Sequence, residues 1–244
     1  MVDVWPFRFV DDLDSFTSIL SEEEQQRAER FLKTAARVRY VQTRAILRLL
    51  TSRLSQLSPD ELTIQQMPSG KPFLPGSKLR VSVAHSARIG ICAISDRAPI
   101  GVDVEQVRPL PEMQSIARES FSKDDRERLH RLKGDASVAW FFQCWTRREA
   151  YVKALGSGLT RSTSSIRFGS SAKPGEAVSV IDAQSPSWQS WYALDLHLCE
   201  GYAGALCFQD AGEVVNVHDV VDADALFTLE NRNAFREASS TGIR

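Results

Sequence analysis

Apolar residues in the first quarter of the chain recur every three or four positions, which is the spacing of one face of a helix. Ser21 and Glu24 form a capping box, so a helix is expected to begin after Ser21. A second helix is expected from 34 to about 57, and its buried stripe consists of Val38, Val41, Ala45 and Leu49. The Pro- and Gly-rich stretch 67–78 is expected to be a loop.

The middle of the chain changes to the alternation of apolar and polar residues that is typical of strands. Residues 79–84, 89–95 and 100–105 read as strands and are expected to form one small antiparallel sheet. Residues 112–133 then look helical and polar, and an amphipathic helix is expected over 135–155. Strand patterns return in the last third, at 165–168, 178–182, 191–198 and 202–208.

This order of elements predicts an α+β fold. The hairpins at 79–94 and 191–208 have similar patterns, which indicates two similar halves related by a pseudo-two-fold axis, each with a small antiparallel sheet packed on helices. We place the N-terminal half at residues 1–110 and the C-terminal half at residues 111–244. The last residues, 240–244, are expected to be disordered.

The 244 residues have an ordinary globular composition, 43% hydrophobic and 25% charged, with a net charge of −1. This charge gives no reason to expect binding to nucleic acid or to an anionic membrane. The four cysteines lack metal-site spacing and are expected to be reduced and mostly buried. An acidic N-terminus without a signal sequence, and apolar runs too short for a membrane span, favour a cytoplasmic globular protein.

The strand predicted at 100–105 carries acidic residues on one face. Successive side chains of a strand point to opposite faces, so Val102 and Val104 share one face. Asp103 and Glu105 share the other face, and neighbouring carboxylates weaken a strand unless they have a partner. The sequence therefore predicts a positive group beside Asp103 and Glu105.

Glu149 and Lys153 lie four residues apart, on one face of the long predicted helix. Taken alone, such a pair is ordinary helix surface. If this face meets the acidic strand, Asp103, Glu105 and Glu149 together offer the oxygen ligands that Mg²⁺ prefers. Arg148 and Lys153 could then bind the phosphates of a substrate.

Other basic residues fit an anionic ligand without requiring one. Lys71 lies in a Gly-Lys-Pro loop, which can present a cation to phosphate, but an exposed loop lysine is an equally good interpretation. His85, at a strand end before Ser86, could bind phosphate, although completing a turn is the more common role. The early helix carries further basic residues, and most of them are expected to be solvated at the surface. They are Arg37, Arg44 and Arg48 on one face and Arg39 on another.

The sequence resembles a known family at separate blocks. Ile-Gly-Val-Asp-Val-Glu at 100–105 and Trp-Thr-Arg-Arg-Glu-Ala-Tyr-Val-Lys at 145–153 are similar to the two signatures of 4′-phosphopantetheinyl transferases. Residues 70–72 and 83–86 resemble two further family blocks, in the same order. The length resembles that of the monomeric type with two similar halves, which serves peptide and polyketide synthases in secondary metabolite biosynthesis. The trimeric type of fatty-acid synthesis is about half as long.

The resemblance implies a reaction and a set of roles. The phosphopantetheine arm of coenzyme A passes to a serine hydroxyl of an apo acyl or peptidyl carrier domain, and 3′,5′-ADP leaves. By resemblance, Asp103, Glu105 and Glu149 bind Mg²⁺, and Glu149 is the candidate catalytic base. Lys153, the other residue with a catalytic role, holds phosphate oxygens together with Arg148. The remaining residues implied for the coenzyme A site are Arg39, Lys71, His85 and Ser86.

Two positions depart from the family pattern. Arg148 stands where the family usually has lysine, and a forked guanidinium should still bind phosphate. Ala84 stands where a close relative has serine, so one hydroxyl contact is missing. Neither change touches the predicted metal ligands.

The stretch 121–126 resembles the family's carrier-facing segment. Phe121 is the expected apolar anchor, and Lys123 and Arg126 are the expected steering charges. Packing of Phe121 in the core is an equally good interpretation, because aromatic residues on amphipathic helices are usually buried.

Two other functions are compatible with these residues. A Mg²⁺-dependent hydrolase of a nucleotide pyrophosphate would use the same carboxylates with water as nucleophile, and it would need no carrier protein. A non-catalytic module that binds coenzyme A or a carrier is the third alternative. It fits less well, because binding alone does not require three carboxylates together with Lys153.

Overall fold

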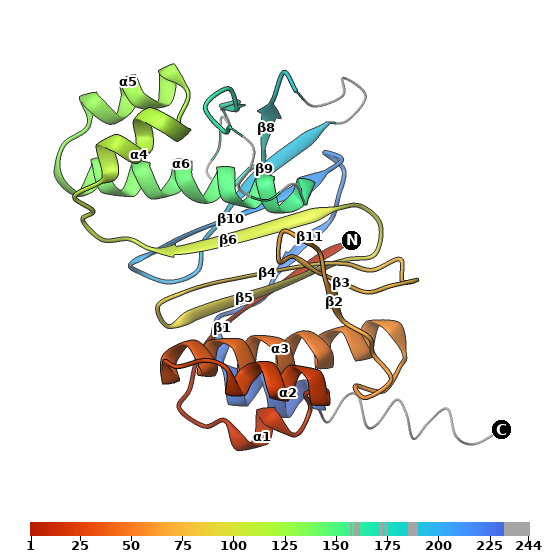
Figure 1. The fold of residues 1–244 in the computed structure, drawn as a ribbon. Coiled ribbons are helices and arrows are strands. Elements are labelled where there is room, and N and C mark those ends of the chain that lie inside the picture. The colour runs from red at the N-terminus through yellow and green to blue at the C-terminus, as the bar shows by residue number, and fades with distance from the viewer. Residues whose placement is uncertain (157, 159–161, 171–172, 174, 185–189, 232–244) are drawn as a thin grey trace.

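A computed structural model describes residues 1–156, 158, 162–170, 173, 175–184 and 190–231. Its layers follow one another in the order helices, first sheet, second sheet, helices (Figure 1). The chain builds most of the first sheet with its N-terminal part, crosses to the second sheet, and returns to the first sheet near its C-terminus. The α+β class predicted from the sequence is confirmed.

The helices beside the first sheet include α1 (Asp14–Thr17), α2 (Glu22–Glu29) and α3 (Thr34–Ser55), and residues 223–231 are helical and pack in the same core. The capping box predicted at Ser21 and Glu24 is present at the start of α2. The predicted stripe of α3 packs on the first sheet, with Val41, Ala45 and Leu49 fully buried and Val38 partly so. The helix ends as Gln56 takes the left-handed conformation.

The first sheet consists of β1 (Val2–Arg8), β4 (Arg80–Ser86), β5 (Ile89–Ser95), β11 (Val215–Val217) and β12 (Val221–Asp222). β1 lies in the middle, antiparallel to β5 and parallel to β11 and β12. Pro6 falls between the residues of β1 that pair with β11 and those that pair with β12, and such an interruption is where a strand tolerates proline. The sequence-based expectations did not include β1 and β11, and almost the whole chain separates these paired strands.

The second sheet consists of β6 (Ile100–Gln106), β10 (Tyr202–Gln209), β9 (Trp191–Leu196), β8 (Val178–Ile181) and β7 (Arg167–Phe168), in this order and antiparallel throughout. The prediction that residues 100–105 extend the sheet of β4 and β5 is wrong, because β6 pairs with β10. Strand alternation identifies a strand and its faces, but it does not identify the partner.

The two sheets also divide the chain differently from the predicted halves. β6 precedes residue 110 but belongs to the second sheet, and residues 215–222 return to the first. The division into an N-terminal half at 1–110 and a C-terminal half at 111–244 stays a prediction. A short hairpin of β2 (Gln65–Gln66) and β3 (Pro72–Phe73) flanks part of the predicted loop. Residues 240–244 lie outside the described residues.

The helices beside the second sheet are α4 (Met113–Ser120), α5 (Lys123–Arg131) and α6 (Gly134–Leu155). They match the predicted helical stretches, with a break at Phe121 and Ser122. Gly156 ends α6 in the left-handed conformation, with φ of 72°. Figure 1 shows α6 lying across β6 and β10, with α4 and α5 at one end of it.

Gly101 sets how closely α6 approaches β6. One face of β6, with Val102 and Val104, packs in the core between the two sheets. On the face toward α6, a Cβ atom at Gly101 would lie 2.0 Å from the carbonyl oxygen of Ala150 and 2.3 Å from the backbone nitrogen of Ala154. Only glycine therefore lets the helix backbone rest directly on the strand.

The cysteines and the helix lengths agree with the expectations from composition. Cys92, Cys144 and Cys207 are buried, Cys199 is partly buried, and all are free thiols. Within the described ranges, no helix has the length and apolar character needed to cross a bilayer.

Candidate functional site

The edges of the two sheets meet where β4 runs beside β6. In the described part of the chain, serine side chains join these strands, whereas no backbone ladder does. Ser82 Oγ accepts the Val102 N–H at 3.1 Å, and Ser86 Oγ accepts the Gln106 N–H at 3.1 Å. Ser86 Oγ also donates to Glu105 Oε2 at 2.7 Å. Ser86, predicted to contact coenzyme A, therefore orients an acidic side chain of the site.

Lys153 supplies a positive partner for Asp103, whereas the resemblance assigns the role of positive partner to Mg²⁺. Lys153 Nζ lies 2.7 Å from Asp103 Oδ1, a carboxylate that is only 5% exposed. Burial raises the pKa of Asp103 to about 7, against the opposing effect of Lys153, and Glu105 and Glu149 add to the rise. Burial likewise raises the pKa of Glu149. The structure thus brings all four predicted residues to one site.

The metal prediction receives partial support from the donor atoms. Asp103 Oδ2 is buried and lacks a hydrogen-bond partner among the described residues, so it is available as a ligand. Carboxylate oxygens are the donors that Mg²⁺ prefers. However, no group of three or more His, Cys, Asp or Glu side chains within the described ranges is gathered closely enough to hold a metal ion. The donor chemistry fits Mg²⁺, and the site itself stays a prediction.

Lys71 connects the hairpin loop to both elements of the acidic site. Its Nζ donates to the carbonyl oxygens of Ile100 and Lys153, each at 2.7 Å. Burial lowers the pKa of Lys71 to about 8, and Arg80 contributes in the same direction. The lysine is therefore not the exposed loop residue of the alternative interpretation. It lines a cavity beside Glu149 and Lys153.

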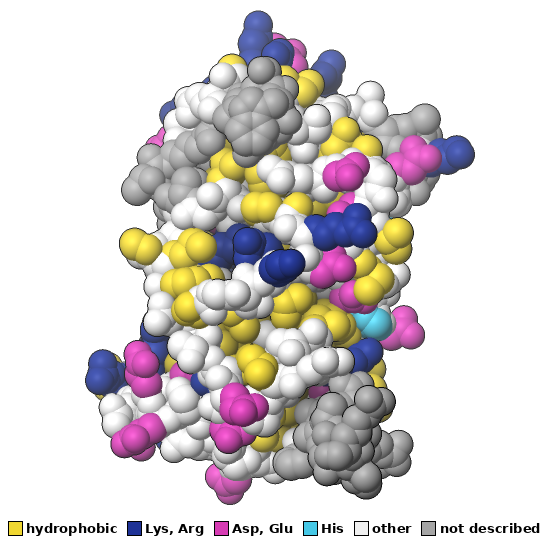
Figure 2. Space-filling model, turned by 90° about the vertical axis from the view of Figure 1, so that its right-hand side faces the viewer, with side chains coloured by type: hydrophobic (Ala, Val, Ile, Leu, Met, Phe, Trp, Pro, Cys, Tyr) yellow, Lys and Arg dark blue, Asp and Glu magenta, His cyan; other side chains and the backbone are white. Residues whose placement is uncertain are grey.

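Two adjoining cavities flank this region, and they share Gly70, Pro72 and Val83 as a common wall. The central cavity, of about 650 Å³, lies between the loop 68–72 and the second half of α6. The basic cavity, of about 280 Å³, lies between α3 and β4. Figure 2 shows basic side chains at mid-height on one face of the molecule, with acidic side chains beside them.

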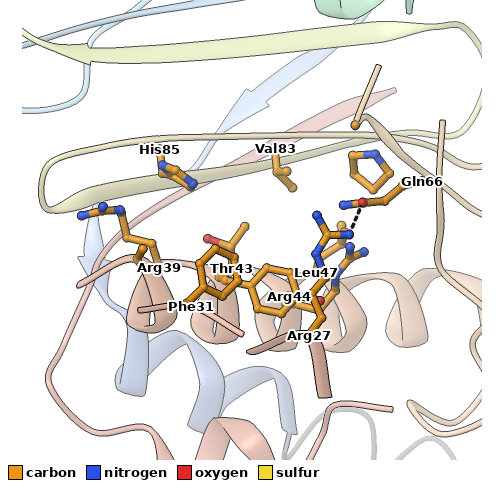
Figure 3. Close-up of a pocket in the computed structure, with 13 residues that line it drawn as sticks. Arg27, Phe31, Arg39, Thr43, Arg44, Leu47, Gln66, Val83 and His85 are labelled. Carbon is orange, nitrogen blue, oxygen red and sulfur yellow. Dashed lines mark hydrogen bonds between the residues drawn. The ribbon is translucent and has the colours of Figure 1, made fainter. Parts of the chain in front are cut away.

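The basic cavity is lined by cationic and unpaired polar groups. Figure 3 shows Arg39 on α3 below His85 of β4, with Arg27 and Arg44 at the other end of the cavity. Arg44 Nη1 and Thr43 Oγ1 are buried without a hydrogen-bond partner among the described residues. Buried polar groups without a protein partner are open to pairing by water or by a polar ligand. Arg39 and His85 thus line the cavity, as their predicted roles require.

The buried arginines of α3 overturn one expectation. The expectation that the arginines of the early helix are mostly solvated does not hold for Arg44 and Arg48, which are buried beside Glu24 with Nε–carboxylate distances of 3.3 and 2.6 Å. Glu24 was recognised only as a capping residue. Its role as the ionic partner of Arg44 and Arg48 depends on the packing of α2 against α3, which the sequence does not show.

Arg148 does not lie where the phosphate-binding prediction requires. It is 1% exposed, and its guanidinium faces the α4–α5 side of α6, where it meets Ser120 and Asp125. The prediction of a phosphate contact is therefore wrong for Arg148. The prediction of Phe121 as an exposed anchor is wrong too, because this ring is 1% exposed and packs on Phe141.

The pKa of His85 lies below the usual value of a histidine. Desolvation is the largest cause, and the positive charges of Arg39 and Lys153 act in the same direction. His85 is thus electrostatically linked to both the basic cavity and the acidic site. An anion bound between Arg39 and Lys153 would relieve this repulsion.

Comparisons with known proteins agree on one family. A family model described as the 4′-phosphopantetheinyl transferase superfamily matches residues 99–207, and one described as 4′-phosphopantetheinyl transferase, N-terminal, matches residues 8–95. A Synechocystis protein named for this transferase activity is 32% identical over 151 residues, which cover 61% of each chain. The match thus spans less than two thirds of that relative's length.

One further relative and one solved structure are also similar to parts of this chain. The 4′-phosphopantetheinyl transferase Sfp of Bacillus subtilis is 27% identical over 195 residues, which cover 80% of this chain and 84% of Sfp. A crystal structure of a holo-(acyl-carrier-protein) synthase from Bacillus anthracis, in complex with CoA (3′,5′-ADP), covers 47% of this chain and 97% of its own. Its sequence identity is 18% and its TM-score is 0.40.

Proposed function

Because this chain belongs to the 4′-phosphopantetheinyl transferase superfamily, we propose that it transfers the phosphopantetheine arm of coenzyme A to a serine of an apo carrier domain. The observation that carries the proposal is the meeting of Asp103, Glu149 and Lys153 beside two adjoining cavities of different character. Coenzyme A has a polyanionic nucleotide end and a long uncharged arm. A basic cavity next to a larger, less charged one suits such a molecule.

The basic cavity takes the nucleotide end. Arg27, Arg39 and Arg44 supply forked donors for phosphate oxygens, and His85 lies opposite them on β4. The central cavity takes the pyrophosphate and the arm, with Lys71 and Lys153 as its lining cations. The remaining lining residues there are mostly small or apolar, which suits the amide arm.

The reaction is an attack of the carrier serine Oγ on the phosphorus that bears the arm. The new P–O bond forms as the bond to the bridging oxygen breaks, and 3′,5′-ADP leaves with the bonding electrons. Glu149 lines the central cavity and accepts the serine proton, directly or through water. Burial raises the pKa of Glu149, which brings its basicity closer to that of a general base at neutral pH. Lys153 binds phosphate oxygens at the centre of the site.

Although the described carboxylates are not gathered around a metal site in this structure, Asp103, Glu105 and Glu149 are the residues that would hold Mg²⁺, which would neutralise pyrophosphate charge when bound. The buried and unpartnered Asp103 Oδ2 supports this assignment. Removal of divalent ions with EDTA should abolish transfer, and added Mg²⁺ should restore it. Transfer that continues in EDTA would remove the metal from the proposal.

The deciding experiment combines the protein, coenzyme A, Mg²⁺ and an apo peptidyl carrier domain, and it follows the intact mass of the carrier. We expect a gain of one phosphopantetheine group, and no gain on a carrier whose acceptor serine is replaced by alanine. Release of 3′,5′-ADP without any carrier would instead support a pyrophosphate hydrolase. Coenzyme A binding without either reaction would support a binding module.

The cellular setting belongs to the same proposal. We propose a cytoplasmic monomer that serves carrier domains of peptide or polyketide synthases and binds neither nucleic acid nor membrane. The near-neutral net charge of −1 supports the exclusion of nucleic acid and anionic membranes. Sedimentation velocity should give a single species near 27.3 kDa. A dimer or trimer at micromolar concentration would contradict the proposal.

A further inference from the structure

Arg148 is an unusual residue because it is almost completely buried and all of its donor nitrogens are engaged. Its Nε donates to the Ser120 carbonyl at 2.9 Å, and Nη1 donates to the Cys144 carbonyl at 3.0 Å. Nη2 donates to Asp125 Oδ2 at 2.5 Å and to the Ile166 carbonyl at 3.1 Å. The guanidinium therefore donates to acceptors from several segments at one junction.

The hydrogen-bond acceptors of Arg148 belong to different segments of the fold. Ser120 is the last residue of α4, Asp125 lies in the first turn of α5, and Ile166 precedes β7. Ser122 Oγ donates to the same Asp125 Oδ2 at 2.6 Å, and Thr163 Oγ1 donates to the Ser120 carbonyl at 3.0 Å. Arg148 is thus the centre of a network that fixes the α4–α5 junction onto α6.

Aromatic rings enclose the guanidinium. Its central carbon lies 4.7 Å from the centroid of Phe121 and 5.2 Å from that of Phe168. Both the charge and the planar fork are therefore used at this position. A lysine would keep the charge, but it could not supply donors in the directions of Ser120, Asp125 and Ile166 at once.

The helices held by Arg148 carry an exposed basic cleft. This α4–α5 cleft, of about 580 Å³, is lined by Gln114, Ala117, Arg118, Lys123, Arg126, Glu127 and His130. Lys123 and Arg126 are the residues expected to steer an acidic carrier domain. Because these residues lie on the helices whose junction Arg148 fixes, the position of the cleft depends on the Arg148 network.

We infer that Arg148 is a positioning residue that sets the α4–α5 cleft at a fixed place relative to Glu149. The two residues are neighbours on α6, and consecutive helical side chains point about 100° apart. Within one turn of α6, Arg148 therefore holds α4 and α5 in place, and Glu149 faces the central cavity. This inference rests on the proposed function, since the cleft serves the carrier and Glu149 serves its serine.

The test compares Arg148→Lys with Arg147→Lys. Arg147 is a matched control because it is also on α6 and also forked onto a carboxylate, with Nε and Nη2 each 2.7 Å from Asp195. Its partner lies on β9, so its loss should disturb the helix–sheet contact and leave the α4–α5 junction in place. Both variants are first compared with wild type by circular dichroism and thermal unfolding.

We expect Arg148→Lys to raise the KM for the apo carrier domain about tenfold or more, since small misplacements of reactants are costly, while the Kd for coenzyme A stays unchanged. Arg147→Lys should leave the carrier KM unchanged even if its loss of Tm is larger. Asp125→Asn should repeat the carrier effect, and the double variant with Arg148→Lys should add little to it. An unchanged carrier KM, or equal losses for carrier and coenzyme A, would overturn the inference.

A second measurement separates this inference from the proposed function. Amide hydrogen exchange of residues 113–131 should be faster in Arg148→Lys than in wild type and in Arg147→Lys, whether or not any carrier is modified. Unchanged protection in this segment would overturn the inference even if the transferase activity is confirmed. If exchange is faster in Arg148→Lys but the wild type has no transferase activity, the inferred role of the Arg148 network is supported and the proposed function is refuted.

Discussion

At the scale of single residues, burial decides the chemistry of the acidic site. Asp103 and Glu149 have ordinary carboxyl groups, but both pKa values rise because the strand and the helix remove water from them. Lys153 compensates part of this cost through its contact with Asp103 at 2.7 Å. The same amino acids on an exposed helix and strand would form a weak surface pair.

Replacement of Glu149 by glutamine tests its role as a base. The variant keeps the shape of the side chain but cannot accept the serine proton, so kcat should fall about 100-fold or more. The Kd for coenzyme A should change far less, because the cations of both cavities remain. Single-turnover transfer and calorimetry measure the two quantities. Equal losses in both would point to a purely structural role.

Lys71 makes the stability of the protein depend on pH in the alkaline range. Its pKa is about 8 in the folded state, compared with 10.5 for an ordinary lysine. Between these values the unfolded chain binds a proton that the folded chain does not, so the contribution of Lys71 to the free energy of unfolding rises with pH. This contribution is complete above the unfolded pKa and is lost as the pH falls through about 8.

Urea unfolding of wild type and Lys71→Met at several pH values checks this prediction. The stability of wild type relative to the variant should increase between about pH 8 and pH 10.5. Below this window the difference should be constant, because both states are protonated. A difference that decreases with pH would show that the carbonyl contacts at Ile100 and Lys153 keep Lys71 charged.

At the scale of elements, the contact between α6 and β6 brings the chemistry together. The strand supplies Asp103 and Glu105, and the helix supplies Glu149 and Lys153. Side chains from the two elements meet because the backbones touch at Gly101. The glycine in the acidic block is thus a requirement of packing.

Gly101→Ala should separate the two elements and reduce transfer strongly. Its Cβ atom would meet the α6 backbone at 2.0 Å, so the helix must shift, at a cost of about 1–3 kcal/mol of unfolding free energy or more. Gly212→Ala is the control, because its Cβ atom would meet Asp210 only at 3.6 Å. Denaturant unfolding and transfer rates measure both effects. An active and fully stable Gly101→Ala would disprove the assigned contact.

At the scale of the whole molecule, charge is segregated although the net charge is only −1. Cations collect in the basic cavity and in the α4–α5 cleft, on helices at opposite sides of the sheet layers. Carboxylates occupy the centre, where β6 and α6 meet. Two different anionic partners could therefore be attracted to two different places.

Charge reversal in the α4–α5 cleft should slow the encounter with an acidic carrier domain. Lys123→Glu with Arg126→Glu should raise the carrier KM, more so at low salt, and leave the Kd for coenzyme A unchanged. Arg8→Glu with Arg97→Glu reverses the same number of charges at other exposed positions. If the cleft variant and this control have the same carrier KM, the carrier docks at another surface.

The α4–α5 cleft also shows how part of a sequence prediction can hold while its centre fails. Lys123 and Arg126 line the cleft as expected, whereas Phe121 is buried in the core. Charged residues on a polar helix reach solvent in almost any packing arrangement, so their exposure is predictable. The exposure of an aromatic residue depends on which helix lies next to it.

The sequence by itself determined the elements and the faces of those elements. Helical spacing gave α3 and α6, alternation gave β4, β5 and β6, and the Asp-x-Glu face of β6 required a cation. These features depend on local periodicity, which a chain carries in any fold. For the same reason, a positive partner for Asp103 could be predicted before Lys153 was known to supply it.

Only the tertiary structure decided which elements became neighbours. It placed β6 beside β10, brought residues 215–217 to β1, and buried Arg44 and Arg48 against Glu24. It also packed the face of α6 that carries Arg148 against Ser120 and Asp125 of the α4–α5 junction. Such outcomes follow from burying the faces of all elements at once, and contacts between residues far apart in the chain leave no local pattern to read.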